Sequence, residues 1–100
     1  MVKHIILWKL SEELPDSRKE EVRIGIKKNL EDLCGKIPGL VSMRININAL
    51  SSSNTDVMMD STFENEEALK AYQNHPEHVK VADTFVRPYT VARSCMDYEI

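Results

Sequence analysis

Residues 2–10 read VKHIILWKL, and this stretch decides the fold. Large apolar side chains occupy both its even and its odd positions, which predicts a β-strand with both faces largely covered. The first ten residues hold no apolar run long enough for a signal peptide or a membrane span. We therefore expect a cytoplasmic protein with no membrane partner.

Three later stretches alternate apolar and polar residues with the period of two that is typical of strands. They cover residues 41–48, 56–63 and 91–99. A polar loop at residues 51–54 separates the first two, so these two are expected to pair antiparallel.

Helical signals begin after the first strand. Following Pro15, Ser17 and Glu20 match an S-x-x-E capping box, which predicts a helix start. Gly35 is expected to act as its C-terminal stop. The apolar residues at helical spacing between these signals are Val22, Ile26, Leu30 and Leu33.

A pair of short helices is expected before the last strand. Asn65 can cap the first of them, which ends at Pro76. Pro76 can also begin the second helix, because the N–H that it lacks would have no partner in a first turn. This helix is expected to reach about Phe85, and Pro88 closes it. The element order predicts an α+β fold, a ferredoxin-like four-stranded antiparallel sheet with its helices on one face.

Composition limits the function classes. With 100 residues, the chain is expected to form a single domain over residues 1–100. Its 13 Lys and Arg against 16 Asp and Glu give a formal net charge of −3, which argues against a nucleic-acid partner. The 2 cysteines are too few for a disulfide framework and are expected as reduced thiols.

One face of the predicted sheet stays uncovered by helices. If the more apolar set of each strand faces the helices, the open face carries His4, Ile6, Trp8, Arg44, Asn46, Met58, Asp60, Arg93, Cys95 and Asp97. This set is too apolar for a solvated surface and too charged for a dry core. A second copy that covers the face and encloses a partly wet cavity would satisfy both limits, so we expect a homodimer.

Several motifs stand out together: VKHIILWKL at the start, IPGL at residues 37–40, Phe63-Glu64, YQNHPEHV at residues 72–79, and Asp97-Tyr98. With them the chain resembles the stress-responsive dimeric α+β barrel (Dabb) family over essentially its whole length. The Y-x-x-H-P-x-H-V run is the specific part of this pattern. The resemblance implies a ferredoxin-like protomer and a homodimer whose two sheets face each other as a barrel.

The resemblance extends to a polyketide cyclase of this family, olivetolic acid cyclase, and implies that Tyr72 and His78 are catalytic. An aldol closure needs a base beside a carbonyl and a donor for the developing oxyanion, roles that suit a histidine and a phenol. Asp97 could orient His78. The residues expected to line or support the same pocket are His4, Ile6, Trp8, His75 and Asp97.

A metal site is a weaker interpretation of the histidines. His75 and His78 share a face and, with His4 or Asp97, could bind a divalent ion. A histidine before a proline more often bonds to the helix entrance, so we expect that role for His75 and predict no metal. Asp97 could also pair with an arginine across the sheet.

The expected function is a stress-responsive barrel protein that binds a small, partly apolar carbonyl or phenolic ligand in a cavity between the sheet and the helix pair. Cyclase-like acid–base chemistry without a cofactor would fit such a cavity. The alternative is a non-catalytic, stress-protective dimer in which the histidines are structural. A third class is an oxygen-dependent monooxygenase of similar shape, and the sequence leaves open whether any reaction is catalysed.

Overall fold

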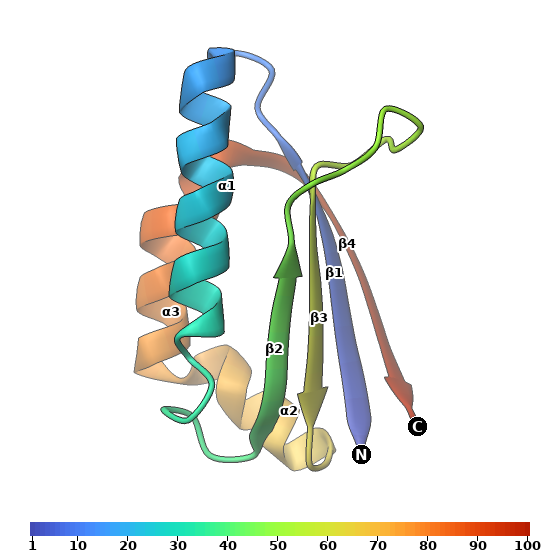
Figure 1. The fold of residues 1–100 in the computed structure, drawn as a ribbon. Helices are drawn as coiled ribbons and strands as arrows, with labels where there is room; N and C mark the ends of the chain where they lie inside the picture. Colours follow the sequence, from blue (N-terminus) through green and yellow to red (C-terminus); the bar gives the residue numbers. More distant parts are fainter.

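Four strands form one antiparallel sheet in the order β2-β3-β1-β4. The computed structural model describes residues 1–100. Helices cover one face of the sheet, β4 forms an outer edge, and the two termini lie at the same end (Figure 1). The predicted ferredoxin-like α+β architecture is confirmed. The strands are β1 (Val2–Leu10), β2 (Leu40–Asn46), β3 (Val57–Phe63) and β4 (Thr90–Glu99).

The first helix, α1 (Asp16–Glu31), packs on the sheet through three residues predicted to be apolar anchors, all of them buried: Val22, Ile26 and Leu30. The predicted capping box is wrong. Pro15 takes the N-cap position, so Ser17 already lies inside the first turn and no side chain caps this end. The predicted stop at Gly35 is also wrong: α1 ends at Glu31 with Asp32 as its C-cap, so Leu33 lies beyond the helix. Gly35 follows in the turn, with a left-handed φ of +93°.

Two short helices precede β4, as predicted. In α2 (Glu66–Asn74), the Asn65 side chain accepts a hydrogen bond from the backbone N–H of Ala68 at 2.8 Å. Pro76 begins α3 (Pro76–Val81). The helical path then continues beyond Phe85 through a π turn, η1 (Ala82–Val86), and a 3-10 turn, η2 (Arg87–Tyr89). Pro88 therefore lies inside the last turn, and the prediction that it closes the helix was wrong. None of the helices combines the length and apolar character needed to cross a membrane.

The side chains of β1 face the opposite way from the sequence expectation. The even positions, from Val2 to Leu10, are buried, and they include His4, Ile6 and Trp8. Directly opposed residues of antiparallel strands share a face. The β4 residues opposite His4, Ile6 and Trp8 are Asp97, Cys95 and Arg93, which therefore also lie on the helix side. The assignment of these six residues to the open face was wrong.

The reason lies in the charges of the central strand. The odd positions of β1 include Lys3 and Lys9, whose ammonium groups keep their hydration only on the open side. The even positions carry no Lys, Arg, Asp or Glu. The other residues of both sets are mainly apolar, so the lysines decide which face of β1 is buried.

The open face still mixes apolar and charged residues. Its predicted members Arg44, Asn46, Met58 and Asp60 are confirmed by the strand register. Ile5, Leu7, Met96 and Tyr98 join them from β1 and β4. Lys3 Nζ lies 2.9 Å from Asp60 Oδ1, an ion pair that crosses from β1 to β3.

Candidate functional site

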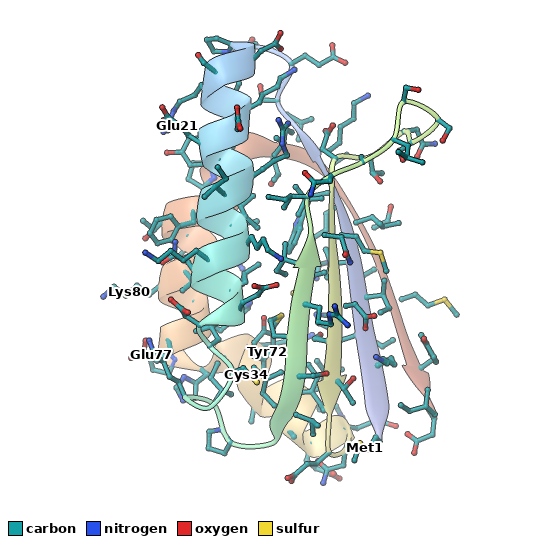
Figure 2. The ribbon with its side chains drawn as sticks, in the orientation of Figure 1. Met1, Glu21, Cys34, Tyr72, Glu77 and Lys80 are labelled. Carbon is teal, nitrogen blue, oxygen red and sulfur yellow. The ribbon has the colours of Figure 1, made fainter.

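A cavity of about 330 Å³ lies between the sheet and the helices, close to the lower end of small-molecule sites. Figure 2 shows Tyr72 on the side of the sheet that the helices cover. Five of the residues expected at the pocket line this cavity together: His4, Ile6, Trp8, Tyr72 and His78. They come from β1 at the start of the chain and from the neighbouring helices α2 and α3, which lie far from β1 in the sequence.

Tyr72 is the most deeply placed polar residue of the cavity lining. Leu69 and Tyr72 are one helical turn apart on the buried face of α2. The Tyr72 hydroxyl is buried and has no hydrogen-bond partner among the groups of the chain. Burial raises the pKa of the phenol, and the positive charge of Arg93 opposes this only in part. The hydroxyl is therefore protonated at neutral pH and can donate a hydrogen bond.

His78 stacks against Tyr72, with ring centroids 4.1 Å apart and an interplanar angle of 35°. Its Nδ1 lies 3.3 Å from the carbonyl oxygen of Gln73. A carbonyl only accepts, so Nδ1 donates in this contact and Nε2 of the neutral ring is an acceptor. Loss of solvation lowers the pKa of His78, and the charge of Arg87 acts in the same direction. The ring is thus neutral near pH 7 and can take up a proton.

His4 and Asp97 form a second polar group beside the cavity. His4 is only 2% exposed, and its Nδ1 bonds to Oδ1 of Asp97. In the structure Asp97 therefore contacts His4 rather than His78 or an arginine. A carboxylate that holds one ring nitrogen sets the orientation of the imidazole.

His75 lies outside the cavity lining. Its Nδ1 accepts a hydrogen bond from the backbone N–H of Glu77 at 3.1 Å and so caps α3. This is the helix-entrance role that the sequence favoured for a histidine before a proline.

Arg93 and Cys95 are among the residues that the sequence analysis did not place at the site. Arg93 lines the cavity, and the Cys95 sulfur lies 3.5 Å from Oδ1 of Asp97. Both reach this side because they pair with Trp8 and Ile6. A correct choice of the buried face of β1 would have brought them to the site.

The fold and the cavity define a ferredoxin-like α+β protein with a small site between sheet and helices. Residues 2–100 match the family model of the stress-responsive A/B barrel domain, Dabb. The chain belongs to this family.

Three solved structures illustrate the similarity. A dimeric protein of unknown function with a ferredoxin-like fold from Bacteroides fragilis is 31% identical, with a TM-score of 0.92 over 99% of this chain and 95% of that chain. A Dabb family protein from Mesorhizobium loti is 16% identical, with a TM-score of 0.76 over 99% and 95%. A hydroxynitrile lyase from Passiflora edulis is 16% identical, with a TM-score of 0.73 over 99% and 92%. The last two share the fold alone. The chain matches no curated protein.

Proposed function

We propose that this chain forms a homodimeric barrel that binds a small, partly apolar carbonyl or phenolic compound in the cavity and acts on it by acid–base chemistry. One observation carries the proposal: Tyr72 lines the cavity, and its buried hydroxyl has no hydrogen-bond partner within the chain. Leaving a buried donor unpaired costs about 1–3 kcal/mol, which an oxygen of a bound ligand would offset. The lining supports such a ligand because apolar Ile6 and Trp8 surround the polar groups.

Tyr72 and His78 have complementary proton chemistry. The protonated phenol can donate to a ligand carbonyl and stabilise an oxyanion that develops there. The neutral His78 ring can remove a proton from the carbon beside that carbonyl. The two rings are in contact, so one small ligand can reach both groups. This proposed chemistry uses the chain's own side chains and calls for no cofactor.

The homodimer is supported by the edge and the open face of the sheet. β4 is an edge strand of 10 residues, and its residues from Val91 to Glu99 are exposed in the single chain. A long exposed edge strand usually has a partner or a cover. Met96 and Tyr98 are 64% and 40% exposed on the open face. A second copy would cover these side chains, and the similar Bacteroides fragilis protein is dimeric.

A probe that contains both proposed ligand groups, 4-hydroxyacetophenone, tests binding. We expect its addition to shift the NMR signals of the His78 ring and to change the fluorescence of Trp8, because both residues line the cavity. His75, which lies outside the lining, is the internal control. Unchanged His78 and Trp8 signals at millimolar probe would favour the non-catalytic dimer.

Deuterium incorporation tests the chemistry separately from binding. In heavy water, a base beside the bound carbonyl should speed exchange of the acetyl protons of the same probe. We expect this catalysis to disappear in His78→Gln and to persist in His75→Gln, which removes a histidine outside the lining. Binding without catalysed exchange would reduce the function to a ligand carrier.

A further inference from the structure

Three side chains with metal-binding atoms meet where β4 pairs with β1. The Cys95 sulfur is 3.5 Å from Oδ1 of Asp97 and 3.8 Å from Nδ1 of His4. The same Oδ1 and Nδ1 are bonded to each other. All three atoms lie within 4.8 Å of one another. Ligand atoms of one tetrahedral zinc ion are separated by about 3.3–3.6 Å, given bonds of about 2.0–2.3 Å.

The strand pairing holds these atoms in place. Cys95 and Asp97 are two residues apart on one face of β4, and Asp97 lies directly opposite His4. His4 is buried and already oriented, so little side-chain freedom would be lost on metal binding. From this arrangement we propose that His4, Cys95 and Asp97 bind one Zn²⁺ ion, with the fourth position open to water or another small ligand.

The donor set fits zinc better than a hard cation. A thiolate, an imidazole nitrogen and a carboxylate oxygen are the zinc ligands common in proteins, whereas magnesium and calcium prefer oxygen alone. The carboxylate and the thiolate together balance the charge of the ion. Burial and the neighbouring Asp97 carboxylate raise the pKa of the free Cys95 thiol, and Arg93 opposes this only in part, so zinc must displace the thiol proton when it binds.

Binding changes the protons at the site in a defined way. The S–H bond of Cys95 breaks, a sulfur–zinc bond forms, and the proton is released to solvent. In the free chain Nδ1 of His4 carries the proton that it donates to Asp97. On binding, Nδ1 releases this proton to solvent and Nε2 takes one up, so the ring stays neutral and Nδ1 binds the ion. The Nδ1 contact to Asp97 opens, and Asp97 Oδ1 turns to the ion. This site differs from the histidine pair considered in the sequence, since it contains neither His75 nor His78.

Cobalt titration of the reduced full chain tests the site. One equivalent of Co²⁺ should produce a thiolate-to-cobalt charge-transfer band and the strong visible absorption of a four-coordinate ion, and Zn²⁺ should bleach both. Cys95→Ser should abolish the charge-transfer band. Asp97→Asn should weaken zinc binding by about 10-fold or more.

Cys34→Ser is the matched control, because Cys34 contacts the carbonyl oxygen of Val41 near the opposite edge of the sheet. It should leave the spectrum unchanged. Absence of the band from the wild-type chain, or its survival in Cys95→Ser, would overturn the proposal. The cobalt titration is done without a cavity ligand, so its result does not depend on the proposed function.

Discussion

Replacing Tyr72 with Phe should make the ligand-free protein more stable. The hydroxyl is buried without a partner, so its removal relieves a desolvation cost of about 1–3 kcal/mol. The ring keeps its packing, with centroids 4.9 Å from Phe63 and 4.1 Å from His78. We expect a gain of about 1 kcal/mol in the free energy of unfolding, equivalent to a rise in Tm of about 4–8 °C for a domain of this size.

Urea unfolding followed by circular dichroism measures this gain. All samples have the same protein concentration, because the apparent stability of a dimer depends on concentration. Tyr89→Phe is the matched control. The Tyr89 hydroxyl accepts a hydrogen bond from Arg18 at 3.0 Å, so its removal should be neutral or cost up to about 1 kcal/mol. If Tyr72→Phe instead lowers stability by more than the control does, the Tyr72 hydroxyl has a partner in solution and the reasoning fails.

Three further predictions concern the helix pair, a turn and the open face. NMR titration should give His78 a pKa below its usual 6.5. The unfolded state then binds more protons than the folded state, so the free energy of unfolding should be full above about pH 6.5 and fall as the pH drops below it. His78→Gln should flatten this pH dependence. In thermal unfolding, Gly39→Ala should cost about 1–3 kcal/mol more stability than Gly35→Ala. Both glycines have a positive φ, but a Cβ at Gly39 would lie 2.5 Å from another Cβ, whereas one at Gly35 meets nothing within 4 Å. Equal losses of stability would contradict the packing of this turn. Leu7→Lys should raise the dimer dissociation constant at least about 10-fold in analytical ultracentrifugation, because it places a charge in the proposed interface, and an unchanged constant would locate the interface elsewhere.

Local patterns were sufficient to predict most of the architecture. Asn65 and Pro76 act on backbone groups within a few residues of themselves, so their roles in α2 and α3 could be inferred without any tertiary contact. The predicted capping box is also a local pattern, but it was wrong. Pro15 starts α1 before Ser17 is reached, and two start signals so close together cannot both be used.

The site was only partly predictable because it depends on which face of β1 is buried. Apolar residues occupy both faces of that strand, and choosing the wrong face displaced every β4 residue paired with it. Tyr72 and His78 could be identified from the motif that contains them. Cys95 was missed together with that face, since its contact with His4 and Asp97 comes from the register of two strands at opposite ends of the chain.

The most direct test of the central claim compares the binding of 4-hydroxyacetophenone to two variants, each of which lacks one tyrosine hydroxyl. If the buried Tyr72 hydroxyl is the donor for a ligand in the cavity, Tyr72→Phe should weaken binding by about 10-fold, the equivalent of one hydrogen bond of about 1.4 kcal/mol. Tyr89→Phe should bind like the wild type. Equal dissociation constants for the two variants, measured by isothermal titration calorimetry, would contradict the claim.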